Sequence, residues 1–384
     1  MTKFMIRVND QTLYYSDLAS LVKALFSEIV PDTDYVGEYE SVKLVIDQAI
    51  NFVNYIGIVL GFNNTFNYPV DLIRPCHILE EIYRLYKTGL SRAWWIINSS
   101  ILASLPLNIE ELYDVMYEFI DYREQRRTSK LKPIFTWDYI EELTKYYSNA
   151  YDEYVELLKP ITNESIDKLV GFMKKCHERF YEKHWEKVSK WLTQYCEIAS
   201  KFIALTKPYD LLVKLIGYKP SFDEIIAYPV DVFRSGGGIY GAFPNRVVIP
   251  SDYTSVPTSY LAIVHEAGHL AVHDWALKLG DKVVTACKKM GLEPSIYLVN
   301  ILEEISMALL QGLADEEVLG YPRITHGYMN TSLYKKLYQV YKELKREGAI
   351  NYYTVMEKFL EEISKDKKCV EELKKLVEVV KNTL

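Results

Sequence analysis

Cysteine is scarce in this 384-residue chain, and the few cysteines stand far apart. No two of them form a Cys-x-x-Cys pair, so the sequence offers neither a disulfide framework nor a cysteine-rich zinc site. Isolated thiols are typical of a reducing compartment, and we expect a cytoplasmic protein. The five cysteines are Cys76, Cys176, Cys196, Cys287 and Cys369.

An excess of positive charge is also absent. Lys and Arg number 45 against 52 Asp and Glu, which leaves a formal net charge of −7. This balance argues against nucleic acid or an anionic membrane as the main partner. One basic stretch runs from Tyr122 to Lys132. We interpret it as a solvated helix end or loop, with a phosphate-binding patch as the alternative.

The chain has little that resembles a secretion signal or a membrane span. Residues Met1 to Asp10 contain no apolar core of signal-peptide length. The longest uncharged stretch, Gln48 to Val70, carries five asparagines, and each side-chain amide would need a hydrogen-bond partner inside a bilayer. We therefore predict an amphipathic helix followed by a loop, in a soluble protein that spans no membrane.

Helical periodicity dominates the chain from its N-terminus to about residue 217. Apolar residues recur at helical spacing in several segments separated by prolines. These segments are 18–26, 78–86, 112–120, 137–158 and 162–205. The 49% hydrophobic content supports a sizeable core, so we predict a folded, mainly α-helical protein.

The pattern changes near Gly217. Ser221 and Glu224 have the spacing of a capping box that would open a short helix. Most of the strand signal then lies between Tyr228 and Pro250. The fold class that we predict is mainly α with a small β-sheet, divided into a helical domain (residues 1–217) and a second domain (residues 218–384) that ends in amphipathic helices.

The chemistry of the chain concentrates in His265-Glu266-Ala267-Gly268-His269, which has the form H-E-x-x-H. We predict a helix from about Ser259 to about Leu279, on which the two imidazoles share one face and can bind zinc. Zinc lowers the pKa of a bound water towards about 7, and Glu266 would take the water's proton and pass it to the leaving amine. Gly268 leaves room beside the metal. The alternative is a helix with two ordinary histidines.

A catalytic zinc needs a third protein ligand and an open position for water. Metzincins place another histidine six residues after the second, but that position is Trp275. We expect His273 to orient or pack rather than to bind the ion. A later helix, about Ser295 to Val318, contains Glu303 and Glu304. Glu304 lies nearer its apolar face and is the preferred ligand, while Glu303 would support the site or face solvent.

An H-E-x-x-H helix followed by a glutamate ligand resembles the gluzincin metallopeptidases. Within them, Glu304-Ile305-Ser306 and the helical bulk are similar to the thimet oligopeptidase and oligopeptidase F family, over about residues 228–330. The resemblance implies a zincin-like catalytic domain with one zinc ion per chain. It implies His265, His269 and Glu304 as the zinc ligands.

The same resemblance implies Glu266 as general base and acid. It also implies a histidine and a tyrosine that stabilise the oxyanion, for which His326 and Tyr328 are the local candidates. A plain turn between two helices is the alternative there. Zincins present a strand edge to the substrate backbone, and Gly241 and Ala242 would let a peptide approach closely. The alternative for these two residues is a core hairpin.

We therefore expect a zinc-dependent metallopeptidase that hydrolyses short or unfolded peptides. A regulatory gluzincin that cuts one protein partner is a second hypothesis. A third is a non-catalytic helical zinc-binding or interaction protein. The cleavage specificity, the choice between endopeptidase and exopeptidase action, and the oligomeric state do not follow from the sequence.

Overall fold

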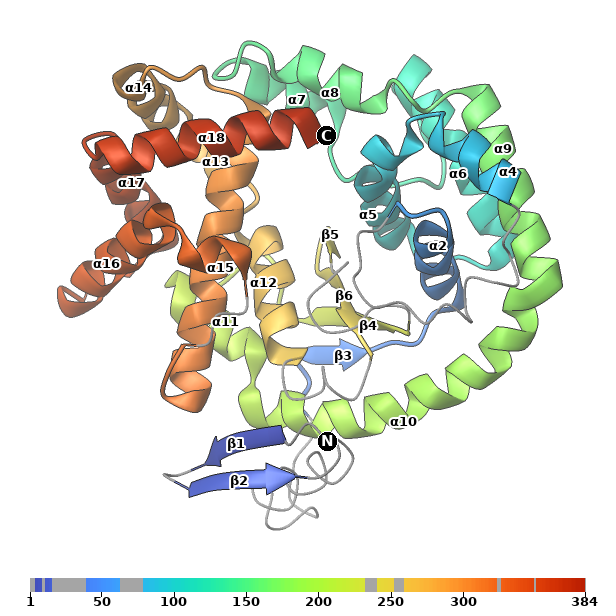
Figure 1. The fold of residues 1–384 in the computed structure, drawn as a ribbon, viewed down its shortest axis with the longest axis horizontal. Helices are drawn as coiled ribbons and strands as arrows, with labels where there is room; N and C mark the ends of the chain where they lie inside the picture. The colour runs from blue at the N-terminus through green and yellow to red at the C-terminus, as the bar shows by residue number, and fades with distance from the viewer. Residues whose placement is uncertain are drawn as a thin grey trace.

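The fold is mainly helical with a small mixed sheet, as the sequence predicts (Figure 1). The computed structural model describes residues 4–8, 11–15, 39–62, 79–231, 240–251, 259–322, 326–348 and 350–383. Three parts of the predictions lie outside these residues: the helical stripe at 18–26, Cys76, and residues 232–239 of the predicted strand region.

The first half of the chain is built from helices that form a broad arc (Figure 1). They are α2 (Gln48–Val59), α4 (Leu79–Tyr86), η3 (Leu90–Ala93), α5 (Trp94–Ser104), α6 (Ile109–Gln125), α7 (Trp137–Thr144), α8 (Ala150–Leu158), α9 (Asn163–Cys176), η4 (His177–Tyr181), α10 (Glu182–Thr206) and α11 (Pro208–Ile216). The predicted helical segment 162–205 is continuous, because a π-helical turn, η4, joins α9 to α10.

The second half contains the remaining helices. They are α12 (Ser259–Val272), α13 (Trp275–Lys278), α14 (Gly280–Met290), α15 (Ile296–Leu319), η6 (Gly327–Asn330), α16 (Ser332–Arg346), α17 (Tyr352–Ile363) and α18 (Lys367–Thr383). Ser295 caps α15, because its hydroxyl accepts the backbone N–H of Leu298 at 3.2 Å. The predicted helix at 295–318 is thus confirmed almost to the residue.

The prediction of helices from the N-terminus to about residue 217 is wrong in two places. Strands β1 (Phe4–Val8) and β2 (Gln11–Tyr15) form an antiparallel pair. Strand β3 (Val42–Leu44) joins a four-stranded sheet of order β3-β4-β6-β5 with β4 (Ile225–Val230), β5 (Gly241–Ala242) and β6 (Arg246–Pro250). β3, β4 and β6 run parallel, and β5 is antiparallel to β6.

The capping box predicted at Ser221 is also wrong. The chain instead enters β4, where the N–H of Ile225 donates to Ser41 O at 2.9 Å. Pairing with β3 and β6 on both sides outweighs the local cap signal. One strand from before residue 217 thus belongs to the sheet of the second half, while the division of the chain into two domains remains a prediction.

Helix α2 is buried on every side instead of being amphipathic. Every residue from Ala49 to Val59 is buried. Its asparagines find partners inside the protein: the amide of Asn51 donates to Pro229 O at 3.1 Å and that of Asn54 to the Tyr240 hydroxyl at 2.8 Å. Among the described helices, α15 alone has the length and composition to cross a membrane, and 78% of its apolar window is buried inside the protein.

The basic stretch at Tyr122 to Lys132 makes ion pairs on the surface. Arg126 lies 2.6 Å from Glu141, and Lys130 lies 3.2 Å from Glu111. Cations that are already paired with carboxylates favour the solvated interpretation over a phosphate-binding patch.

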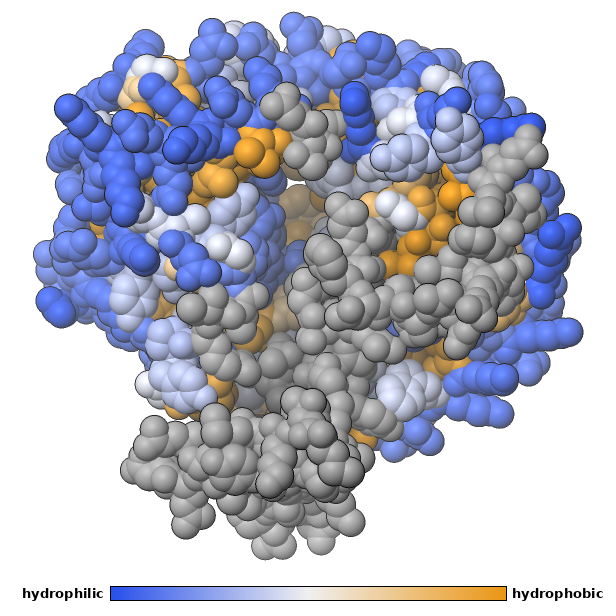
Figure 2. All heavy atoms as spheres, in the orientation of Figure 1, coloured by the Kyte–Doolittle hydropathy of each residue, from blue (hydrophilic) through white to orange (hydrophobic). Residues whose placement is uncertain are grey.

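Helices α7 and α8 and the turn between them contact the second half of the chain beside α12 and α15. The Tyr139 hydroxyl donates to His273 O at 3.1 Å, and the Tyr147 hydroxyl donates to Ala276 O at 2.8 Å. Glu153 accepts the backbone N–H of Ile296 at 3.0 Å, at the start of α15. These α7–α8 contacts close the arc of helices opposite α10 (Figure 1). Figure 2 shows a polar outer surface and a hollow near the middle of this face.

Candidate metal centre

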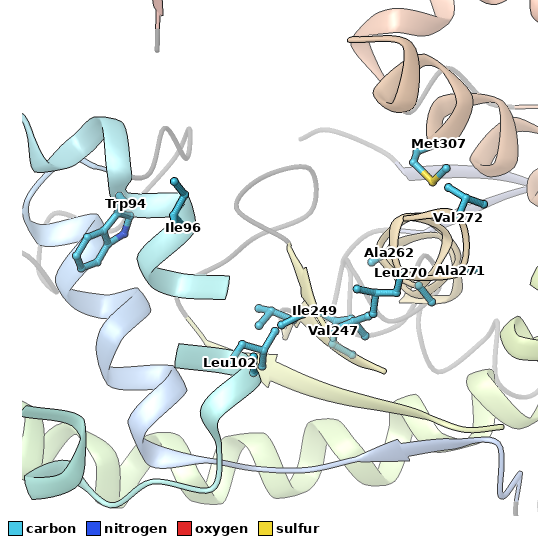
Figure 3. Close-up of a cluster of buried hydrophobic side chains, with 14 of the residues drawn as sticks. Trp94, Ile96, Leu102, Val247, Ile249, Ala262, Leu270, Ala271, Val272 and Met307 are labelled. Atoms are coloured by element: carbon cyan, nitrogen blue, oxygen red, sulfur yellow. The ribbon is translucent and has the colours of Figure 1, made fainter. Parts of the chain in front are cut away.

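The H-E-x-x-H segment lies on α12, which is buried almost throughout. Side chains of β6 and α5 pack below it, as Figure 3 shows for Val247, Leu102 and Leu270. The predicted helix end at Leu279 is wrong, because α12 stops at Val272. A turn at His273 and Asp274 separates it from α13.

Gly268 is the point at which α12 meets α15. A Cβ atom at this position would lie 2.6 Å from Met307 Sδ and 3.1 Å from Leu310 Cδ1. The space beside Gly268 therefore admits the neighbouring helix rather than the metal, which corrects the sequence interpretation. Close approach of the two helices brings Glu304 to the histidines.

Three predicted ligands converge at this crossing. His265 Nε2 and His269 Nε2 lie 3.3 Å apart, and each lies 3.6 Å from a carboxylate oxygen of Glu304. Four ligands around a zinc ion with bonds of about 2.0–2.1 Å would lie about 3.3 Å from one another. The donor set and its spacing therefore fit a zinc ion without rearrangement of the backbone.

The two adjacent glutamates have different surroundings. Glu304 faces the Nε2 atoms of both histidines. Glu303 lies on the other side of His269, with its Oε1 atom 2.6 Å from Nδ1. The second oxygen of Glu303 accepts the indole N–H of Trp275 at 2.9 Å. Sequence reasoning missed Trp275 as a partner, because no spacing rule links it to a residue 28 positions later.

Burial and charge act together on the ionisation of these groups. Burial alone would raise the pKa of Glu304, but its contact with His265 and the charges of His269 and His265 lower that pKa to about 2. Burial would lower the pKa of His269, yet the hydrogen bond that its ring donates to Glu303 and the charge of Glu304 raise that pKa to about 10. In the metal-free site the surrounding carboxylates thus favour the protonated form of His269.

Glu266 lies beside the donors without being one of the converging three. Its Oε1 atom is 3.9 Å from His265 Nε2, and only 5% of the residue is exposed. Burial raises the pKa of this carboxyl, and the charges of His265 and His269 only partly offset the effect. A carboxylate with a raised pKa is a stronger proton acceptor than an ordinary carboxylate.

His326 and Tyr328 also reach the site, from the segment at η6. His326 Nε2 lies 3.7 Å from a carboxylate oxygen of Glu304, and its ring stacks on His265 with centroids 5.3 Å apart. The Tyr328 ring stacks on that of His326 with centroids 5.4 Å apart. Burial and the charge of His265 lower the pKa of His326 to about 4, while burial raises that of Tyr328.

The proton of His326 can be assigned from its hydrogen bonding. Its Nδ1 atom accepts the backbone N–H of Tyr328 at 3.3 Å. A neutral imidazole that accepts at Nδ1 carries its proton on Nε2. The atom facing Glu304 is therefore a donor. His326 nevertheless belongs to a second group of possible metal ligands. One ligand atom each of His265, Glu304 and His326 lie within 4.8 Å of one another.

The surroundings of Gly241 and Ala242 in β5 do not match the expectation that a peptide approaches closely there. A Cβ atom at Gly241 would lie 3.2 Å from Glu266 O, and Ala242 is fully buried. α12 therefore makes the close approach. β5 is the last strand in the order of the described sheet, on the side that packs against α12 and α5.

His273 lies apart from the converging donors, in the turn after α12. Its Nδ1 atom lies 3.1 Å from Leu270 O, and its ring packs edge-on against Phe243. This placement agrees with a packing role.

Comparisons of the chain with protein-family models, with curated proteins and with solved structures gave no match.

Proposed function

We propose that this chain is a zinc-dependent metallopeptidase that hydrolyses short or unfolded peptides. The observation that carries the proposal is the spacing of the His265, His269 and Glu304 donors, with the Glu266 carboxyl beside them. Two imidazoles and one carboxylate form a donor set of catalytic zinc sites, which leave one position open. The crossing of α12 and α15 next to β5 is compatible with a zincin-like catalytic part.

Access to the site supports a catalytic role over a sealed one. His265 and Glu266 side chains are 6% and 7% exposed, whereas Glu304 and His326 are 28% and 23% exposed. His265 and Glu266 are thus buried, while the site is more open at Glu304 and His326. A substrate would approach from that side.

Each residue has a distinct task in the proposed reaction. A bound zinc ion would supply a Lewis acid for the peptide carbonyl and lower the pKa of water. Glu266 accepts the proton of the attacking water and returns it to the leaving amine. The Nε2–H of His326 and the hydroxyl of Tyr328 would donate to the carbonyl oxygen as it gains charge. The raised pKa of Tyr328 keeps its hydroxyl protonated at neutral pH.

Zinc content and peptide cleavage test the proposal together. The purified chain should bind one equivalent of zinc and cleave members of an unstructured peptide library. Cleavage should stop with a chelator and return with added zinc. Glu266→Gln should retain the zinc and lose cleavage by roughly 10²–10⁴-fold. Undiminished cleavage by Glu266→Gln, or a wild-type chain that binds no zinc, would contradict the proposal.

One observation favours a second function, a non-catalytic zinc site closed by four ligands. His326 Nε2 lies 3.7 Å from Glu304 and belongs to the group of donors within 4.8 Å. A fourth protein ligand would leave no position for water, as in structural zinc sites. Against it stands the Tyr328 N–H on His326 Nδ1, which keeps the proton on Nε2. The effect of replacing His326 on zinc affinity separates the two functions.

A further inference from the structure

The carboxylate of Glu303 contacts other side chains of the protein, unlike that of a solvated residue on a helix surface. Both of its carboxylate oxygens have partners, because Oε1 contacts His269 Nδ1 at 2.6 Å and Oε2 accepts from Trp275 Nε1 at 2.9 Å. The side chain is 20% exposed. Its orientation is therefore determined from two sides by groups on α12 and α13.

Trp275 supports Glu303 from a fully buried position. The residue is 0% exposed and lies at the start of α13. Because the indole nitrogen is a donor only, it can orient a carboxylate but cannot compete with it for the histidine. The end of α12 at Val272 and the turn that follows bring this indole back towards α15.

The consequence for His269 concerns its two ring nitrogens. A histidine that donates its Nδ1–H to a carboxylate presents the lone pair of Nε2. Nε2 is the atom that lies 3.3 Å from His265 Nε2 and 3.6 Å from Glu304. The two histidines differ in this respect, because His265 Nδ1 is buried with no hydrogen-bond partner in the described part of the chain.

We infer that Glu303 is a positioning residue that holds His269 in the metal-binding tautomer and orientation, and that Trp275 holds Glu303 in place. The inference rests on the proposed metal centre and adds to it two residues that touch neither ion nor substrate. Of the two histidine ligands, His269 is the one oriented by a carboxylate, so its contribution to zinc affinity should depend on residues outside the ligand set.

Zinc affinity of Glu303→Gln, measured by competition with a chromophoric chelator, tests the inference. A glutamine replaces one of the two acceptor oxygens of Glu303 with an NH2 donor group, so it cannot reproduce the contacts with both His269 and Trp275. Affinity should fall roughly 10–100-fold, and the visible spectrum of the cobalt-substituted protein should change. The matched control is Glu317→Gln, on the same helix but paired with Lys214 and Lys345 on the surface. It should leave affinity and spectrum unchanged.

A double-mutant cycle of Trp275→Phe and Glu303→Gln tests whether Trp275 acts on His269 through Glu303. If the indole acts through Glu303, the combined loss of zinc affinity in the double variant should be smaller than the sum of the single losses. The thermal midpoint of each metal-free variant is measured in parallel, because the substitution of a buried indole lowers stability by itself. Fully additive losses would overturn the role of Trp275.

The inference and the proposed function fail in different ways. A wild-type chain without zinc affinity contradicts the proposed function. A wild-type chain with one zinc ion and a Glu303→Gln variant of equal affinity overturns only the positioning role. A lower thermal midpoint of metal-free Glu303→Gln with unchanged zinc affinity would likewise show that the residue acts on the fold and not on His269.

Discussion

Met307 packs its sulfur against Gly268, in the space that a side chain at position 268 would fill. A Cβ atom there would lie 2.6 Å from Sδ. This contact brings α12 against α15, and Figure 3 shows Met307 directed towards α12 next to Val272. The histidines and Glu304 belong to these two helices. Their separation therefore depends on a residue that binds nothing itself.

Gly268→Ala should destabilise the protein by about 1–3 kcal/mol, because the added methyl group forces the two helices apart. Zinc affinity should fall as well, since Glu304 would move away from His265 and His269. Urea denaturation of the metal-free protein and chelator competition measure the two effects. The control is Gly171→Ala in α9, where a Cβ would meet nothing within 4 Å. It should stabilise the protein by about 0.5–1 kcal/mol. Equal effects of the two substitutions would contradict the prediction.

His326→Ala should leave zinc affinity within a few-fold of wild type and lower kcat/KM roughly 10²–10³-fold, as expected for the loss of an oxyanion donor. The reason is that the proton on Nε2 makes this histidine a donor and not a ligand. Chelator competition and peptide cleavage are the measurements. His273→Ala, a nearby histidine outside the donor group, is the control and should bind zinc normally. Loss of zinc from His326→Ala alone would point to the closed, non-catalytic site.

Tyr147→Phe should cost about 1–3 kcal/mol of the free energy of unfolding, because it leaves the buried carbonyl of Ala276 without its hydroxyl donor. The loss should speed hydrogen exchange in α13 and at the start of α15, where α7 and α8 hold the second half of the chain. Urea denaturation and hydrogen exchange measure it. Tyr146→Phe is the matched control, because the Tyr146 hydroxyl makes no hydrogen bond within the described residues. A loss of equal size in both variants would argue against the contact.

Glu118 should make stability depend on acid pH. Burial would raise the pKa of its carboxyl, but the Ser129 hydroxyl and the backbone N–H groups of Leu131, Ser129 and Lys130 lower it below the ordinary value of 4.5. A depressed folded pKa means that the contribution is present above pH 4.5 and is lost as pH falls through the folded pKa.

Glu118→Gln should therefore lower the free energy of unfolding by about 1–2 kcal/mol at pH 7, because the charged acceptor is lost. Denaturation curves at pH 7 and pH 3 measure the effect, and the difference from wild type should shrink at the lower pH. Glu164→Gln removes a surface pair with Lys168 and should change stability little. A difference between Glu118→Gln and wild type that grows towards pH 3 would contradict the assignment.

Local sequence patterns predicted a helix correctly where the residues within the helix and at its cap determine its formation. The apolar run around His265, the Ser295 cap and the spacing of Glu303 and Glu304 predicted α12 and α15 and placed the imidazoles on one face. They failed at Ser221, where a local cap signal lost to strand pairing with Ser41 and its neighbours, more than 180 residues earlier in the chain. They also failed at α2, because the Pro229 carbonyl and the Tyr240 hydroxyl, far along the chain, accept hydrogen bonds from its buried asparagines.

Short-range sequence determined which groups can bind a metal: two imidazoles one turn apart, a carboxyl between them and a pair of glutamates on a later helix. Tertiary packing decided how they are used. Contact between Gly268 and Met307 brings Glu304 to the Nε2 atoms, and Trp275 keeps Glu303 at the opposite ring nitrogen of His269. The physical reason is range, since helical periodicity fixes directions within one helix, while distances between helices depend on the volumes of side chains that meet only in the folded protein.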